Sequence, residues 1–124
     1  MHYLVIALGG ALGAMSRAYL GSVFTKLLGT SFPFATLAVN FLGSFLMGIC
    51  AVIILDHFKM PGYWRELVMV GFLGALTTFS TFSLEGLSLI HAGEFMAALT
   101  YFLASVIGCV FACFLGWHVA RLFV

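Results

Sequence analysis

The chain has 124 residues, of which 64% are hydrophobic and 7% are charged, and its formal net charge is +1. Soluble domains carry about 25% charged residues, so this composition excludes an ordinary water-soluble domain. The near-zero net charge also excludes a basic surface for nucleic acid. An apolar run follows Met1-His2 at once, without a basic segment or a clear cleavage site. We therefore expect no signal peptide and interpret this first run as a membrane span.

Four hydrophobic runs each reach the roughly 20 residues that are needed to cross the hydrocarbon core of a bilayer. They are Tyr3–Leu28, Phe34–Leu55, Trp64–His91 and Phe95–Val124. The breaks between them are short, so neighbouring spans are expected to run antiparallel. The sequence predicts an all-α membrane protein with four transmembrane helices in a single domain, residues 1–124.

The first span combines small residues with one buried charge. Gly9, Gly13 and Gly21 follow one another at multiples of four residues, a spacing that lets helix backbones approach closely, so we expect them to serve packing. Arg17 falls well inside the span. It is either a functional residue, a structural cap on backbone carbonyls, or a side chain that extends toward one membrane surface.

The second span carries polar and small residues on one predicted helix face. These residues are Thr36, Asn40, Gly43, Ser44 and Met47. The NH₂ group of Asn40 can donate to an anion and its oxygen can accept a hydrogen bond. The alternative role for Asn40 is a hydrogen bond between helices.

The third span holds the most unusual stretch, Gly71–Glu85, which reads Gly-Phe-Leu-Gly-Ala-Leu-Thr-Thr-Phe-Ser-Thr-Phe-Ser-Leu-Glu. Glycine and short hydroxyl residues are weak helix formers, so we predict that the helix breaks here. Freed carbonyls can hold a cation, and the N–H groups that begin the next half-helix can bind an anion. The alternative is an intact helix whose hydroxyl groups bond back to carbonyls one turn earlier.

Two phenylalanines and an acid complete this stretch. Phe79 and Phe82 are three residues apart, so in a helical turn they share one face. The edge of an aromatic ring is electropositive, and two edges can flank an anion without adding a formal charge. Their alternative role is packing. Glu85 follows one turn later, where it either faces a wet vestibule or is neutral.

The fourth span offers Tyr101, Ser105 and Cys109 at steps of four residues. This polar stripe either passes an ion or bonds to its own helix. Cys109, Cys50 and Cys113 are the only cysteines, and all lie in apolar runs without a CxxC pair or a Cys/His cluster. An odd number of such thiols argues against a disulfide framework and against structural zinc.

The distribution of basic residues bears on how the chain inserts. Both termini and the Asp56–Tyr63 loop share one side, which carries Lys59, Arg65 and Arg121. The other side carries Lys26, and also Arg17 if that side chain extends toward it. This is a weak bias under the positive-inside rule, so the chain is expected to insert both ways. An antiparallel pair would then place two broken third spans against each other.

Three motifs together resemble the Fluc (CrcB) fluoride channels. They are Gly9-Gly-Ala-Leu-Gly-Ala-Met-Ser-Arg17, Thr36-Leu-Ala-Val-Asn40-Phe-Leu-Gly-Ser44 and the Gly71–Glu85 stretch. The length, the four spans and the order of the motifs also match, so the resemblance covers essentially the whole chain. The Thr-Thr-Phe-Ser-Thr-Phe-Ser run is the most specific part.

The resemblance implies a dual-topology antiparallel homodimer in the bacterial inner membrane, with two pores that export fluoride passively. It also implies one central structural sodium ion, held by the backbone carbonyls of Gly74 and Thr77 of both subunits. The residues that it implies for the pore are Asn40, Phe79, Phe82, Ser80, Thr81, Tyr101 and Ser105, with Glu85 as a vestibule acid. Cys109 departs from the pattern, because a hydroxyl residue could continue the polar track at that position.

Two other functions compete with this interpretation. Small multidrug exporters are also short four-span proteins, but they resemble one another in using a first-span glutamate, and this first span has Arg17 and no acid. A non-transporting assembly subunit would use every small-residue face for packing. We do not expect an enzyme, because the spans contain no Ser/His, paired-carboxylate or metal-ligand constellation.

Overall fold

The computed structural model describes residues 1–124 and consists of helices and short connections. The helices are α1 (His2–Leu28), α2 (Phe34–Cys50), η1 (Ala51–His57), α3 (Gly62–Trp64), η2 (Arg65–Leu73), α4 (Gly74–Leu76), α5 (Phe79–His91) and α6 (Phe95–Phe123). The elements η1 and η2 are π-helical.

These helices form four long apolar rods, each long enough to cross a membrane. The rods are His2–Leu28, Phe34–His57, Gly62–His91 and Phe95–Phe123. The prediction of four spans is therefore confirmed, and every predicted end lies within two residues of the observed one.

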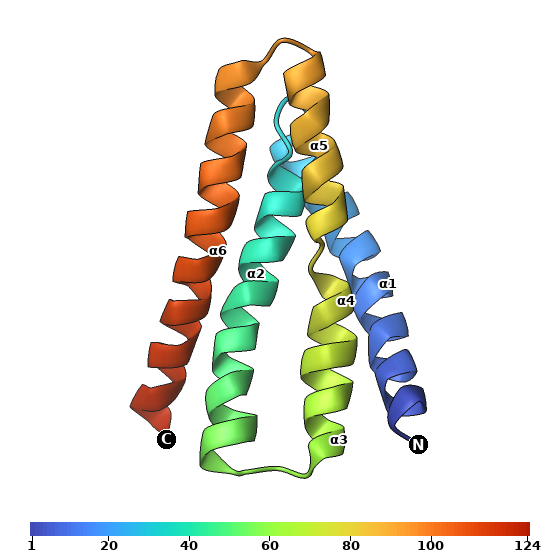
Figure 1. The fold of residues 1–124 in the computed structure, drawn as a ribbon, viewed down its shortest axis with the longest axis vertical. Helices are drawn as coiled ribbons and strands as arrows, with labels where there is room; N and C mark the ends of the chain where they lie inside the picture. The colour runs from blue at the N-terminus through green and yellow to red at the C-terminus, as the bar shows by residue number, and fades with distance from the viewer.

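The connections between the rods are short, so adjacent rods run antiparallel and both termini lie at the same end of the bundle (Figure 1). Pro33 and Pro61 each directly precede a helix, where a missing N–H costs nothing. Gly29, at the end of α1, has a φ of 82°, a left-handed conformation that glycine adopts without strain.

Backbones touch directly at two helix pairs. A Cβ atom at Gly9 or Gly13 of α1 would collide with a backbone carbonyl oxygen of η2, and one at Gly48 of α2 would collide with a carbonyl of α6. Gly21, in contrast, has no atom within 4 Å of its hypothetical Cβ, so it makes no close helix contact within the single chain. A step of four residues advances about 40° around an α-helix, which carries Gly21 off the packed face.

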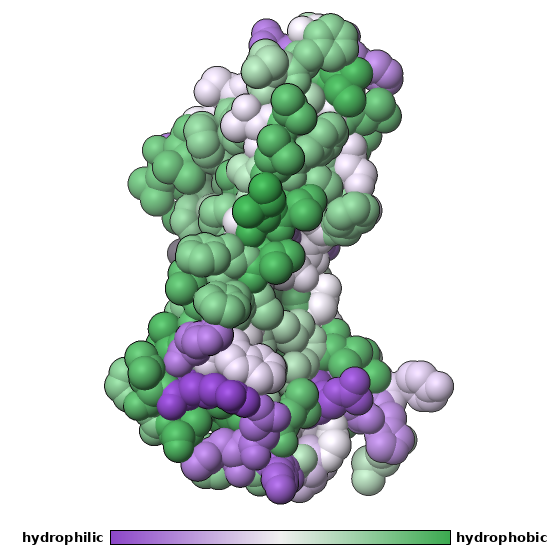
Figure 2. Space-filling view, turned by 60° about the vertical axis from the view of Figure 1, so that its left-hand side comes forward, coloured by the Kyte–Doolittle hydropathy of each residue, from purple (hydrophilic) through white to green (hydrophobic).

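The surface is apolar along the length of the rods. Only 18 of the 124 residues are buried within the single chain, and apolar residues cover most of the face in Figure 2, with hydrophilic residues gathered toward the lower end. At the end that holds the termini, His2 Nδ1 lies 2.7 Å from Glu66 and Arg121 lies 3.3 Å from Asp56. So large an apolar surface requires lipid or a further protein surface to cover it.

Candidate functional site

The third rod is interrupted at Thr77 and Thr78, between α4 and α5 (Figure 1). Thr77 has φ −81° and ψ 157°, and Thr78 has φ −148° and ψ 125°, so both residues are extended. Backbone groups released in this way at membrane depth need partners within the protein or in a polar cavity.

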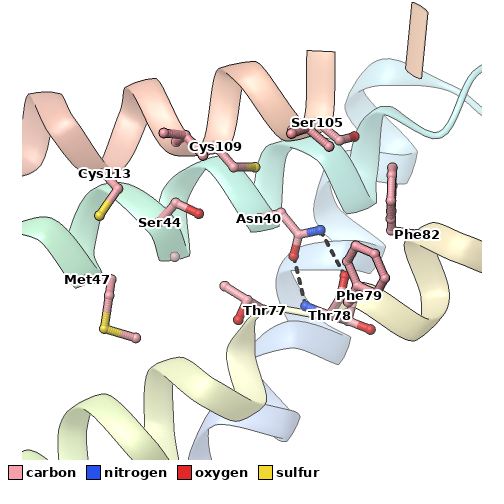
Figure 3. Close-up of a pocket in the computed structure, with 13 residues that line it drawn as sticks. Asn40, Ser44, Met47, Thr77, Thr78, Phe79, Phe82, Ser105, Cys109 and Cys113 are labelled. Carbon is pink, nitrogen blue, oxygen red and sulfur yellow. Dashed lines mark hydrogen bonds between the residues drawn. The ribbon is translucent and has the colours of Figure 1, made fainter. Parts of the chain in front are cut away.

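Asn40 of α2 makes hydrogen bonds to both the N–H and the carbonyl of Thr78. The Thr78 N–H donates to Asn40 Oδ1 at 2.8 Å, and Asn40 Nδ2 donates to the Thr78 carbonyl at 3.0 Å (Figure 3). Asn40 therefore makes an interhelical hydrogen bond. An amide nitrogen has two N–H groups, so a second donor remains for a ligand.

The Thr78 side chain caps the N-terminus of α5. Its Oγ1 accepts a hydrogen bond from the Thr81 N–H at 3.2 Å and lies 3.1 Å from Thr81 Oγ1. This is a helix N-cap, which satisfies one of the free N–H groups of the first turn. Thr78 was not among the predicted site residues, and it is followed three residues later by Thr81, not by the Glu or Gln that would mark a capping box in a sequence.

Arg17 lies beside the same interruption. Its Nη1 is 3.5 Å from the carbonyl oxygen of Thr77, which is long for a hydrogen bond. Of the three roles left open for Arg17, this position agrees with the cap on a backbone carbonyl.

A groove runs from the interruption along α2 and α6 (Figure 3). It is lined by Asn40, Gly43, Ser44, Met47, Thr77, Thr78, Phe79, Phe82, Ser105, Val106, Cys109, Val110 and Cys113. None of these side chains carries a formal charge. The groove is thus mostly apolar, with a few uncharged polar groups from residues such as Asn40, Ser44 and Ser105. Uncharged groups of this kind can bind an ion without trapping it.

The two phenylalanine rings stand at one end of this groove. Their centroids are 5.2 Å apart, as their three-residue spacing predicted. Phe82 is 7% exposed, whereas Phe79 is 75% exposed. Phe79 therefore projects out of the chain, and Phe82 packs against Tyr101 with a centroid distance of 5.1 Å.

The remaining pore candidates lie in different places. Ser105 lines the groove, and its buried Oγ has no hydrogen-bond partner. Ser80 and Thr81 are exposed and lie outside the groove lining, with Ser80 Oγ 3.4 Å from Thr78 Oγ1. Tyr101 is fully buried. The groove thus joins four of the predicted pore residues, Asn40, Phe79, Phe82 and Ser105. Ser80, Thr81 and Tyr101 do not line it.

Two of the five hydroxyl residues in the Gly71–Glu85 stretch donate a hydrogen bond to a carbonyl one turn earlier. Thr77 Oγ1 donates to the Leu73 carbonyl at 3.0 Å, and Ser83 Oγ donates to the Phe79 carbonyl at 2.9 Å. This pattern was expected of an intact helix, and here it occurs on either side of the interruption. Ser44 and Cys113 also line the groove, although neither was predicted as a site residue.

Glu85 lies in a second pocket, near the end of the bundle opposite the two termini. Its carboxylate accepts hydrogen bonds from Thr36 Oγ1 at 2.8 Å and from the Tyr101 hydroxyl at 2.6 Å. The pocket also contains the hydroxyl residues Thr25, Thr30, Ser31 and Ser88. Hydroxyl residues thus surround Glu85 in this pocket, and its role as a vestibule acid stays a prediction.

Known proteins resemble this chain over almost its whole length. Residues 4–117 match the family described as CrcB-like protein, Camphor Resistance (CrcB). The chain is 49% identical over 121 residues to a fluoride-specific ion channel FluC of Hahella chejuensis, covering 98% of this chain and 95% of that protein. It is 48% identical to the protein of the same description from Magnetococcus marinus, covering 94% and 95% of the two chains. The corresponding Vibrio cholerae protein is 41% identical over 113 residues, with 91% and 90% covered.

Proposed function

This chain belongs to the CrcB-like family, and on that premise we propose that it is a fluoride channel through which fluoride leaves the cell passively across the cytoplasmic membrane. The observation that carries the proposal is the uncharged groove beside the interrupted helix, with Asn40, Phe79 and Phe82 at one end. Relatives described as fluoride-specific channels, similar over almost the whole chain, support it.

The groove offers several weak donors in place of the water that surrounds fluoride. These are the second N–H of Asn40, the unpartnered hydroxyl of Ser105 and the ring edges of Phe79 and Phe82. Ser80, Thr81 and Tyr101 continue the proposed path beyond the groove. Because no lining side chain is positively charged, an anion is stabilised without being held too tightly to leave.

Fluoride efflux from liposomes that contain the purified chain, measured beside chloride efflux, tests this function. A fluoride channel releases fluoride rapidly and retains chloride. Release of a cationic drug driven by a proton gradient would instead favour a multidrug-type exporter. The absence of any anion flux would favour a non-transporting assembly subunit.

We expect Phe79→Ile and Phe82→Ile each to lose most of the fluoride flux while the protein still folds. Isoleucine keeps apolar bulk but lacks the electropositive ring edge. We expect a loss of about tenfold or more, which corresponds to about 1.4 kcal/mol of lost stabilisation of the ion in the pore. Efflux is measured on fractions that elute as the unmodified protein does in gel filtration. Normal flux in both variants would show that the rings only pack.

We also propose that two copies associate as an antiparallel homodimer with two pores. Phe79 projects out of the single chain, and Gly74 is exposed with only the Met69 carbonyl within 4 Å of its hypothetical Cβ. The surface around the interruption is thus open to a second copy. Three basic residues lie on the side that holds the termini (Lys59, Arg65 and Arg121), and one, Lys26, lies on the other side. Arg17 counts toward neither side because it lies at the interruption. That is a small bias in favour of one orientation.

Labelling of single cysteines in cell membranes tests dual topology. In a chain whose three native cysteines are replaced by serine, Val124→Cys places one thiol at the end with both termini. In a separate variant, Thr30→Cys places one at the opposite end. A reagent that does not cross membranes should label about half of the copies at each position if both orientations occur. Full labelling at one position and none at the other would rule out an antiparallel pair of identical chains.

For the centre of this dimer we propose one structural sodium ion, coordinated by the carbonyls of Gly74 and Thr77 of both copies. The residues fit a hard cation, which prefers oxygen ligands. The Thr78 N–H, which would bond to the Gly74 carbonyl in an intact helix, donates to Asn40 instead. The Thr77 carbonyl oxygen lies 3.5 Å from Arg17 Nη1, and its second lone pair is available to an ion.

Replacing sodium by a large organic cation should lower the melting temperature of the purified dimer, because an ion that binds only the native state stabilises it. Thr77→Ser is expected to respond to sodium as the unmodified chain does, since the proposed ligand is the backbone carbonyl. A melting temperature independent of sodium would overturn this proposal and leave the fluoride pathway untouched.

A further inference from the structure

Two thiols line the groove on successive turns of α6. Cys109 and Cys113 are both half-buried lining residues, and Figure 3 shows their sulfur atoms on the side of α6 that faces α2. The third cysteine, Cys50, does not line the groove and packs beside the core of Val39, Leu73 and Leu76. The chain therefore separates two groove thiols from one packing thiol.

The spacing of the groove thiols suits a single bridging ion. Cβ atoms four residues apart on a helix lie about 5–6 Å from each other. A metal with bonds to sulfur of roughly 2.3 Å, as in zinc thiolates, spans two sulfur atoms at that separation. Both thiols are partly exposed, so an ion can reach them from the groove.

The chemistry of the surroundings selects the kind of ion. No group of three or more His, Cys, Asp or Glu residues is positioned to hold a metal, which excludes the four-ligand sites that zinc prefers. Two thiols with a thioether nearby, from Met47 across the groove, are soft ligands. Soft monovalent ions such as Cu(I) and Ag(I) accept two sulfur ligands in a line.

A buried polar group of the same groove points to a ligand as well. Ser105 precedes Cys109 by one turn, is 6% exposed, and its Oγ lacks any hydrogen-bond partner. An unpaired buried hydroxyl is costly, and it can donate to a negatively charged group that forms beside it. A metal held by two thiolates is such a group.

We propose that Cys109 and Cys113 bind one soft monovalent metal ion in the groove and that the bound ion blocks fluoride. Each thiol releases its proton to water as its sulfur binds the metal. One monovalent ion and two thiolates then carry a net charge of −1. This charge repels fluoride in a groove that is otherwise uncharged, and the metal also fills part of it. The blocking step rests on the proposed fluoride function, whereas the binding step does not.

Silver ion serves as the probe, added as the nitrate in chloride-free buffer to the purified chain in detergent. Isothermal titration calorimetry should show one tight silver site per chain. Bound silver should also protect two of the three cysteines from alkylation, with Cys50 still modified. Cys109→Ser and Cys113→Ser should each weaken silver binding by at least roughly tenfold, because even the loss of an outer-shell partner commonly costs that much affinity.

The matched control is Cys50→Ser, which removes a thiol outside the groove and should bind silver as tightly as the unmodified chain. Unchanged binding in both groove variants, or lost binding in Cys50→Ser, would overturn the site. In liposomes, silver should abolish fluoride efflux by the unmodified chain but not by the groove variants, each compared with its own metal-free rate. Full efflux at saturating silver would overturn the block. If no metal-free fluoride efflux occurs, the proposed function fails while the binding result stands.

Discussion

Gly13→Ala is expected to leave little folded protein. A Cβ atom at this position would collide with the backbone carbonyl of Phe72, which is fixed in η2 and has no flexible end that could move aside. Inserting a methyl group into a packed site costs about 1–3 kcal/mol, and contact with backbone places this variant at the upper end. The yield of monodisperse protein in detergent and its melting temperature both measure the loss.

The matched control for this variant is Gly10→Ala on the same helix. Its hypothetical Cβ has no atom within 4 Å, and alanine is a better helix former than glycine by about 0.8–1.0 kcal/mol. Gly10→Ala should therefore fold at least as well as the unmodified chain. Equal losses in the two variants would mean that the effect comes from the helix itself and not from its contact with η2.

Asn40→Leu is expected to combine a loss of stability with a loss of flux. Leucine has a similar size but makes neither of the two hydrogen bonds to Thr78. The Thr78 N–H and carbonyl would then be left unpaired, at a cost of about 1–3 kcal/mol each. The variant also removes the amide N–H that we propose for the ion. The melting temperature reports the first loss, and fluoride efflux from liposomes reports the second.

Ser44→Ala provides the comparison for Asn40. Ser44 lies one turn further along α2 and lines the same groove, but it makes no hydrogen bond to the interruption. Its replacement should leave the melting temperature within the range of an ordinary surface change, about ±0.5 kcal/mol. If Asn40→Leu were equally stable and conducted fluoride normally, the two bonds to Thr78 would have no part in holding the site together.

The spans could be predicted from the sequence because the bilayer imposes both their length and their composition. The stretch around Gly71–Glu85 was also recognisable, since it combines glycines with five hydroxyl residues, which are all weak helix formers. The pairing of Asn40 with Thr78 was not, because it joins residues 38 positions apart. Such a contact depends on how two helices are rotated about their axes, which neither periodicity nor composition specifies.

The same limit explains which pore candidates fell outside the groove. Successive residues of an α-helix are separated by about 100°, so Phe79 and Phe82 share a face while Ser80 between them points elsewhere. The resemblance implied all of these residues for the pore, but in the single chain only some of them line the groove. Gly21 shows the corresponding effect for packing, since a four-residue spacing follows one helix face only over a short distance.

Both ends of the chain leave the bundle on the same side (Figure 1), and this limits how two copies could become one gene. In a direct tandem fusion, the second copy would begin on the side where the first one ended and would insert in the same orientation. A single polypeptide with two opposed copies therefore needs a linker that itself crosses the membrane. Identical copies from an unfused gene need no such linker, because each copy acquires its orientation separately at insertion.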